Sequence, residues 1–426
     1  MGADCVGDWN LDLWQSRYRI ETLSVFNIES RGHEKSDGMG WPRGSVKAMS
    51  EVKRPRVLVV FGGRSSEHLV SCATAAGVLH AIDRERFDVL AVGITRDGQW
   101  VHVDSKPELV DLRTASNTTI EPGLSRVSLL PGLARLVETT YDRTPEDDDA
   151  RIVSVEDLGV IDVVLPLLHG PYGEDGTIQG LFEMANVRYV GCGVTSSAVS
   201  MDKHLTKTVL AEAGIAVGRW ELVTEKEWSR DPQEVRSRIE ALGFPVFVKP
   251  TRGGSSVGIS RVDSLDQLDL AIKEAAANDP RIIVEAMAYG REVECGVRVP
   301  AGGDSMAAPL GEIGVPEGEF YDYALKYVDT DAISLMCPAD VPEEDAARIQ
   351  ETALKAFEAL ECEGLARVDF FYNDATHEII VNEVNTMPGF TRLSLYPRVW
   401  GEAGLSYTEL VTSLLEEAMS RPLGLR

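Results

Sequence analysis

The chain of 426 residues is long enough for roughly two to four domains, each with its own hydrophobic core. Apolar residues make up 44% of it, an ordinary share for a soluble globular protein. Acidic residues outnumber basic ones by 68 to 42, and the formal charge of −26 argues against a nucleic-acid partner, because phosphate contacts need a basic face. One small pocket of Lys and Arg for a nucleotide is compatible with this charge.

The lengths of the apolar runs and the spacing of the cysteines indicate in which cellular compartment the protein works. Runs such as Val57–Phe61 and Val163–Leu168 stop far short of the roughly 20 residues that a membrane span needs, so no membrane partner is expected. The six cysteines show no C-x-x-C spacing, so neither a disulfide framework nor a zinc site is indicated. A reducing cytoplasm fits this pattern best.

Residues 1–48 differ from the rest of the chain. They show no sustained helical or strand period and no apolar core of a signal peptide. We interpret them as a disordered segment or an extension from an upstream start site; a functional arm is the alternative. A clear strand pattern begins only after Met49.

An open α/β domain is predicted for the next part of the chain. Val57–Phe61 has the continuous apolar character of a buried parallel strand, and a glycine-rich turn leads from it into a predicted helix at Leu69–Ala81. The turn lacks the G-x-G-x-x-G spacing of a dinucleotide site. Glu67 at this junction could bind a ligand's ammonium group; the alternative is an acidic residue that stabilises the helix N-terminus.

Two further strands continue this alternation up to about residue 200. They are predicted at Val89–Ile94 and Ile161–Leu168, and the segment Thr95–Leu158 between them is polar and weakly patterned. The second strand ends in His169, beside a glycine-rich loop. A structural and a functional role for this histidine are equally compatible with its position.

Two lysines stand beside loops that could bind phosphate. Lys203 lies in the first turn of a helix capped by Ser200–Asp202, where the helix dipole disfavours a cation unless an anion is near; a solvated lysine is the alternative. Lys249 precedes the Gly/Ser loop Thr251–Gly258, whose amides and hydroxyls, including Ser256, suit a phosphate lid. The alternative for this loop is a flexible linker.

Carboxylates and an aromatic segment follow. The strand Ile282–Glu285 ends in an acid, and Glu285 and Glu292 could bind the ribose and border the adenine of a nucleotide; surface salt bridges are the alternative. Tyr321–Tyr327 reads as an aromatic lid that carries one lysine, Lys326. The last segment, Tyr407–Met419, has helical spacing and is predicted to pack as a closing helix.

A hairpin near the C-terminus carries the strongest chemical pattern. Strands are predicted at Ala366–Tyr372 and Glu378–Val384, joined by a polar turn that brings Asp369 close to the level of Glu383. Glu383 and Asn385 share a face because side chains alternate along a strand.

The face of this hairpin suits a metal and a phosphate. Asp369, Glu383 and Asn385 offer the hard oxygen donors that Mg²⁺ prefers. Arg367 joins them with a planar cationic fork, and Gly389 in the turn that follows permits close backbone approach. The alternative is a surface hairpin with an acidic face; the arginine and the Pro-Gly turn favour a magnesium–phosphate site.

Taken together, the chain resembles the D-alanine–D-alanine ligases of the ATP-grasp superfamily over about residues 55–419. The resemblance rests on seven motifs in the family's order: GGRSSEH, HGPYGEDG, SMDK, VKPTRGGSSVG, YDYALKY, RVDFF and NEVNTMPGFT. It implies an α/β protein in which an open, mostly parallel α/β domain precedes an ATP-grasp fold. The implied domains are an N-terminal substrate domain at 52–202, a central grasping domain at 203–288 and a C-terminal domain with the magnesium site at 289–426.

The resemblance also implies an activity. ATP would phosphorylate the carboxylate of one D-alanine, and the amine of a second would attack this D-alanyl phosphate, which yields D-alanyl-D-alanine for peptidoglycan. ATP and magnesium would be required, with two magnesium ions and manganese as a possible substitute. A cytoplasmic homodimer is expected, with small molecules as the binding partners.

Roles for individual residues follow from the same resemblance. Those assigned to catalysis or to the two substrates are Glu67, His169, Ser255, Tyr327, Arg367, Gly389 and Ser394. Those assigned to the nucleotide are Lys203, Lys249, Ser256, Glu285, Glu292 and Lys326, and those assigned to the metal are Asp369, Glu383 and Asn385.

Three other functions are alternatives to this one. A D-alanine–D-lactate ligase would share the first half-reaction, and Tyr327 in the lid argues against it. A non-catalytic ATP-binding sensor would be expected to lack a metal ligand or Arg367, and both are present. A hydride-transferring enzyme would need the missing dinucleotide fingerprint.

Overall fold

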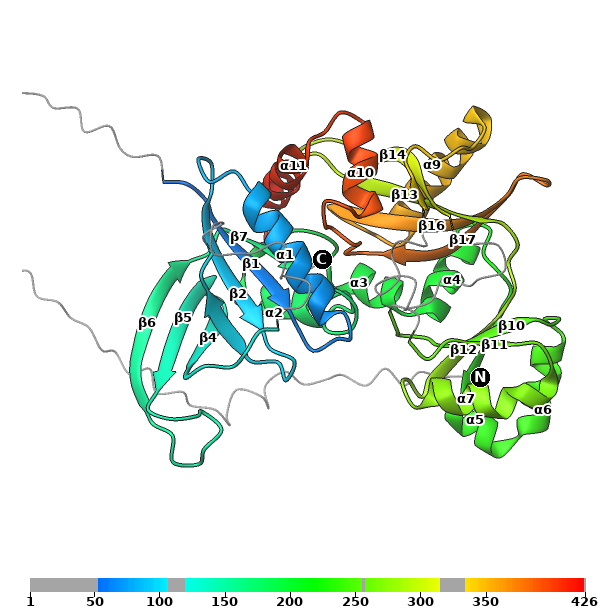
Figure 1. Cartoon of the computed structure of the whole chain (residues 1–426), viewed down its shortest axis with the longest axis horizontal. Coiled ribbons are helices and arrows are strands. Elements are labelled where there is room, and N and C mark those ends of the chain that lie inside the picture. The colour runs from blue at the N-terminus through cyan, green and yellow to red at the C-terminus, as the bar shows by residue number, and fades with distance from the viewer. Residues whose placement is uncertain (1–52, 106–118, 255–256, 315–333, 425–426) are drawn as a thin grey trace, which may run out of the picture. The chain divides into compact units, whose positions relative to one another are not determined.

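A computed structural model describes residues 53–105, 119–254, 257–314 and 334–424 (Figure 1). The hypothesis about residues 1–48 and the site residues Ser255, Ser256, Lys326 and Tyr327 lie outside these ranges. Within them, no helix is both long enough and apolar enough to cross a membrane.

The first sheet is the predicted open α/β sheet. β1 runs parallel to both β2 and β7, and only the edge strand β3 is antiparallel to its neighbour. Because β1 and β7 are flanked on both sides, their apolar runs are buried. In spatial order the strands are β3 (Trp100–Val103), β2 (Asp88–Ile94), β1 (Arg56–Gly62), β7 (Val163–Leu167) and β8 (Arg188–Tyr189), and the helices of this part are α1 (His68–Ala81), α2 (Thr177–Ala185) and α3 (Val194–Met201).

A small antiparallel sheet occupies much of the segment that the sequence left without structure. Its strands are β4 (Ser125–Leu130), β5 (Arg135–Tyr141) and β6 (Ile152–Val160). The edge strand β6 is exposed along most of its length, so its residues show little of the apolar–polar alternation that marks a half-buried strand. For this reason the sequence pattern did not predict β6.

The central part of the chain forms an antiparallel sheet covered by short helices. Helix α4 (Lys203–Glu212) leads into it, and Asp202 caps that helix, as predicted, by accepting the N–H groups of His204 and Leu205 at 3.1 Å. In spatial order the strands are β11 (Ser260–Val262), β10 (Val246–Pro250), β12 (Arg281–Ala286) and β9 (Trp220–Thr224), and the helices are α5 (Glu225–Arg230), α6 (Pro232–Glu240), the short 3₁₀ helix η4 (Leu265–Gln267) and α7 (Leu268–Ala276).

The C-terminal part forms a second antiparallel sheet, which contains the predicted hairpin. The hairpin strands extend one residue or so beyond the predicted bounds. In spatial order the strands are β15 (Ser334–Met336), β14 (Met306–Gly314), β13 (Arg291–Arg298), β16 (Leu365–Asn373) and β17 (Glu378–Asn385), and the helices are α9 (Glu343–Ala359), α10 (Leu395–Glu402) and α11 (Tyr407–Ser420).

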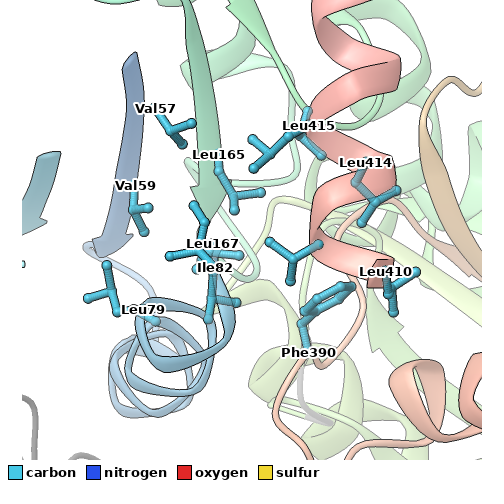
Figure 2. Close-up of a cluster of buried hydrophobic side chains, with 14 of the residues drawn as sticks. Val57, Val59, Leu79, Ile82, Leu165, Leu167, Phe390, Leu410, Leu414 and Leu415 are labelled. Carbon is cyan, nitrogen blue, oxygen red and sulfur yellow. The ribbon is translucent and has the colours of Figure 1, made fainter. Parts of the chain in front are cut away.

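The predicted closing helix forms as α11, and the structure shows that it closes the core of the first sheet. Leu410, Leu414 and Leu415 of α11 belong to one buried cluster with apolar side chains of β1 and β7, and Leu415 lies beside Leu165 (Figure 2). Phe390, from the loop after β17, belongs to the same buried cluster. This packing holds the loop that follows the acidic hairpin against the α/β sheet.

Candidate active site

One cavity of about 940 Å³ collects side chains from all three major sheets and their loops. Among the described residues, every member of the predicted site lines it except Glu285, which contacts the lining residue Lys249. The lining members are Glu67, His169, Lys203, Lys249, Glu292, Arg367, Asp369, Glu383, Asn385, Gly389 and Ser394.

The acidic hairpin has the register that the sequence predicted. Asp369 on β16 is paired with Glu383 on β17, and Arg367 is paired with Asn385. Asn385 donates a hydrogen bond from Nδ2 to Asp369 Oδ2 at 2.9 Å. The two carboxylates and the amide therefore form one polar cluster on the wall of the cavity.

This cluster fits a hard divalent cation. It offers two carboxylates and an amide oxygen, the donor types that magnesium takes alongside water and substrate phosphate. Each carboxylate oxygen has two lone pairs, so the hydrogen bonds to Asp369 leave it able to bind a metal. The roles of Asp369, Glu383 and Asn385 as ligands stay predictions.

Arg367 is held in place by two acids. Its Nε and a terminal nitrogen donate to the two oxygens of Asp369 at 2.6 and 2.7 Å, and Glu294 on β13 lies 3.2 Å from Nε. Burial works against the charged form, but Asp369 and Glu294 outweigh it and raise the pKa of Arg367 well above its usual range. The guanidinium is therefore a fixed, permanent cation at the cavity wall.

Glu294 was missed in the sequence, although its spacing contained a signal. It lies two residues after Glu292, on the same strand β13, whose register places it opposite Asp369. The strand alternation alone would have put both glutamates on one face.

A buried carboxylate lies between two lysines. Lys249 on β10 donates to Glu285 Oε2 at 2.7 Å, and the Nζ of Lys207 on α4 lies 3.4 Å from Oε1. Burial alone would raise the pKa of Glu285, but Lys207 and Lys249 together lower it to about 2. Lys207 was missed; its signal is the four-residue spacing from Lys203, which places both on one side of a helix.

The glycine-rich loop after β10 is anchored at its base. Buried Asp279 accepts the hydroxyl of Thr251 at 3.0 Å and the guanidinium of Arg252 at 2.7 and 2.9 Å. Lys203 donates from Nζ to the carbonyl of Gly253 at 2.8 Å and lies 3.8 Å from Glu383. Lys203 thus reaches from the loop toward the acidic hairpin, across the space where a phosphate chain is predicted to bind.

Glu67 is enclosed by two glycines. A Cβ added at Gly170 would lie 2.5 Å from Glu67 Oε2, and one at Gly254 would lie 2.7 Å from it. Ser65, two residues earlier, donates to the carbonyl of His169 at 2.6 Å. Glu67 is therefore placed by close backbone approach from two different loops, and its role in binding an ammonium group stays a prediction.

His169 lines the cavity, but its ring is engaged on both sides. Nδ1 hydrogen-bonds the carbonyl of Met387 at 3.0 Å, and Nε2 lies 3.2 Å from the hydroxyl of Thr74. Burial lowers the pKa of His169, which favours the neutral ring. These contacts support a structural role at least as directly as the predicted contact with substrate.

The loop after β17 presents the remaining predicted residues. A Cβ at Gly389 would lie 3.2 Å from the hydroxyl of Ser394, so the glycine allows a close turn. Ser394 itself accepts the N–H of Thr391 at 3.1 Å and hydrogen-bonds its hydroxyl at 2.8 Å. This loop therefore has a compact, internally bonded form.

The fold and this cavity define an ATP-grasp protein. Lysines come from or beside a four-stranded antiparallel sheet, and carboxylates come from a five-stranded one. The VanG D-Ala:D-Ser ligase of Enterococcus faecalis is structurally similar with a TM-score of 0.71 and 35% identity, over 86% of this chain and 100% of that one. The D-alanine-D-alanine ligase of Coxiella burnetii is similar with a TM-score of 0.70 and 30% identity, over 86% of this chain and 94% of that one.

Comparison with other protein sequences identifies the family within the ATP-grasp class. Residues 56–192 match the family described as D-ala D-ala ligase N-terminus, and residues 209–416 match D-ala D-ala ligase C-terminus. The D-alanine--D-alanine ligase of Pseudarthrobacter chlorophenolicus is 49% identical over 378 residues, which cover 88% of this chain and 96% of the relative. The D-alanine--D-alanine ligase of Mycobacterium tuberculosis is 46% identical over 380 residues, which cover 88% of this chain and 98% of the relative. The chain belongs to the D-alanine–D-alanine ligase family.

Proposed function

We propose that this chain is an ATP-dependent ligase that joins two D-alanines through a D-alanyl phosphate, and so supplies a peptidoglycan precursor. The observation that carries the proposal is the meeting of Glu67, Arg367 and Lys249 in one cavity. An acid for an ammonium group, a fixed cation for an oxyanion and a lysine for phosphate are the groups that this chemistry requires.

The first step is attack of a D-alanine carboxylate oxygen on the γ-phosphorus of ATP, with ADP as the leaving group. Such a transfer depends on positioning and on charge stabilisation rather than on a covalent enzyme intermediate. Lys249 and Lys203 bring positive charge to the phosphate chain, and the anchored glycine-rich loop adds backbone N–H groups. The carboxylate of Glu285 keeps Lys249 in position.

In this scheme magnesium would be held by Asp369, Glu383 and Asn385. The proposal includes two magnesium ions. The metal would neutralise charge on the phosphate oxygens when bound. The pairing of Asp369 with Glu383 across the hairpin supports this assignment. Glu292, on the cavity wall, and Glu285 would contact the nucleoside.

The second step is attack of the other D-alanine's amine on the acyl phosphate carbon. The attack forms the C–N bond and leaves negative charge on the former carbonyl oxygen of the tetrahedral intermediate. The carbonyl re-forms as the C–O bond to phosphate breaks, and the nitrogen gives up a proton to solvent. Arg367 and the amide of Gly389 would stabilise that oxyanion. Glu67 would hold the first ammonium group, and Ser394 the second carboxylate.

The proposal extends to the domain organisation, the location and the assembly of the chain. A division at 52–202, 203–288 and 289–426 follows the succession of sheets. A cytoplasmic location suits an ATP-consuming enzyme whose described cysteines are free thiols. A homodimer is expected from the family resemblance.

A direct assay tests the function. Full-length protein is incubated with ATP and magnesium, and with D-alanine, L-alanine or D-lactate separately, while phosphate release and products are followed. We expect phosphate release and D-alanyl-D-alanine with D-alanine alone. Because one structural relative is named a D-Ala:D-Ser ligase, mixtures of D-alanine with D-serine or D-lactate are included. A mixed product formed in preference to D-alanyl-D-alanine would overturn the proposed second substrate.

A further inference from the structure

Glu174 has no role in the chemistry described so far, yet it lines the same cavity as Glu67 and Gly389. It belongs to the loop between β7 and α2 and lines the cavity wall. Its Oε2 accepts the N–H of Gly170 at 2.7 Å, and its Oε1 accepts the N–H of Met387 at 2.9 Å. One carboxylate thus joins two chain segments that are far apart in sequence.

Each of these bonds leads to a predicted substrate contact. Gly170 lies directly against Glu67, because a Cβ there would come within 2.5 Å of Glu67 Oε2. Met387 lies two residues before Gly389, whose amide is proposed to bind the oxyanion. The ammonium subsite and the oxyanion subsite are therefore held to the same side chain.

The backbone carbonyl of Met387 is held as well as its N–H group. Its carbonyl hydrogen-bonds Nδ1 of His169 at 3.0 Å, so the loop from His169 to Glu174 holds both polar backbone groups of this residue. The loop is also hydrogen-bonded within itself: Glu174 donates its own N–H to the carbonyl of Gly170 at 2.9 Å, and Gln179 donates to the carbonyl of Gly173 at 2.8 Å.

We propose that Glu174 is a positioning residue that sets the distance between the carboxylate of Glu67 and the amide of Gly389. This inference rests on the proposed function. A carboxyl group is suited to the task because both of its oxygens keep acceptor lone pairs, with or without a proton, so it can hold two N–H groups from different segments. A glutamine in its place would turn an NH₂ group toward one of the two donors.

Glu174 is half-buried in the cavity wall, and its surroundings shift its pKa. Burial and the nearby Glu67 raise the pKa of Glu174 to about 8, although the two N–H bonds and Arg367 act in the opposite direction. A solvated surface glutamate would not experience such an environment.

The test compares two variants of the same loop. Glu174→Gln removes one of the two bridging bonds. Asp175→Asn alters a carboxylate whose hydrogen bonds within the described residues come from its own loop, from the N–H groups of Tyr172 at 2.9 Å and Thr177 at 3.0 Å. We expect kcat to fall about 100-fold in Glu174→Gln, the effect of a misplacement on the order of 1 Å. We expect Asp175→Asn to stay within about threefold of wild type, because its bonds do not reach Met387.

Two readouts separate positioning from simple loss of structure. KM for ATP should stay within about threefold in both variants, since Lys249 and Lys203 do not contact this loop segment. Affinity for a phosphinate analogue of the tetrahedral intermediate, measured with ATP present, should fall in Glu174→Gln by about the same factor as kcat/KM for D-alanine. If the glutamine variant does not fold, Glu174→Asp replaces it, because it keeps the charge but is too short to reach both N–H groups.

The outcomes are distinct. Wild-type protein that forms no D-alanyl-D-alanine would overturn the proposed function itself. Active wild type with near-normal Glu174→Gln, or with equal losses in Glu174→Gln and Asp175→Asn, would overturn the positioning role alone. A parallel loss of ATP affinity and phosphinate affinity would also overturn it, by indicating a general disturbance of the cavity.

Discussion

Asp369 and Glu383 are direct partners across the β16–β17 ladder, and a bulge interrupts the register immediately after them. Bulges often occur beside active sites, where they redirect side chains. We expect Glu383→Gln to abolish turnover while the circular dichroism spectrum stays unchanged, because it removes a charge with little change in volume. Glu378→Gln, at the exposed start of the same strand, is the control. Rates within a few-fold of wild type at saturating magnesium would show that Glu383 is no ligand.

Arg367→Lys should fail even though it keeps the charge. The guanidinium donates to both oxygens of Asp369 and also lies beside Glu294, a pattern that one ammonium group cannot reproduce. Losing an oxyanion donor typically lowers kcat by ~10²–10³-fold. Arg348→Lys, at a half-exposed arginine that pairs with Asp345, is the matched control. Near-normal kcat in Arg367→Lys would leave the Gly389 amide as a sufficient donor.

Lys207→Met should weaken ATP binding, although Lys207 would act through Glu285 and not by touching the nucleotide itself. Its buried ammonium lies 3.4 Å from Glu285, which also holds Lys249. Removing one partner leaves part of a buried carboxylate unsatisfied, at a cost of about 1–3 kcal/mol. We expect KM for ATP to rise about tenfold. Exposed Lys226→Met is the control, and an unchanged KM for ATP in Lys207→Met would contradict the prediction.

Gly254→Ala should raise KM for D-alanine selectively. The added methyl would lie 2.7 Å from Glu67 Oε2, so the carboxylate must move from the place where an ammonium group is proposed to bind. A rise of about tenfold is expected from the loss of one charged hydrogen bond. Gly180→Ala, where a Cβ meets nothing within 4 Å, should leave KM unchanged. Equal effects of the two substitutions on KM would speak against the contact with Glu67.

Glu174 should make the stability of the protein depend on pH. Its pKa is raised in the folded state from an ordinary 4.5 to about 8, mainly by burial. The folded protein therefore holds a proton in this window that the unfolded chain has released. The resulting stabilisation is fully present below about pH 4.5 and is lost as the pH rises through about 8. Melting temperature between about pH 6 and 9 should fall less steeply in Glu174→Gln than in wild type; parallel slopes would contradict this.

The sequence by itself was sufficient where the deciding interactions are local. The hairpin of β16 and β17 was predictable because two strands with period-two alternation flank a short polar turn, and this alone sets Asp369 opposite Glu383. The cap at Asp202 and the closing helix α11 were predictable for the same reason, since both depend on residues within one or two helical turns.

Only the tertiary structure decided which distant groups meet. His169 and Met387 are 218 positions apart, and Glu174 and Met387 are 213 apart, so no local period links them. The strand β6 escaped prediction because its exposure erases the alternation from which strands are recognised. Side-chain partners across such separations depend on how the sheets and α11 pack together, and that packing is the sum of many contacts that no single motif contains.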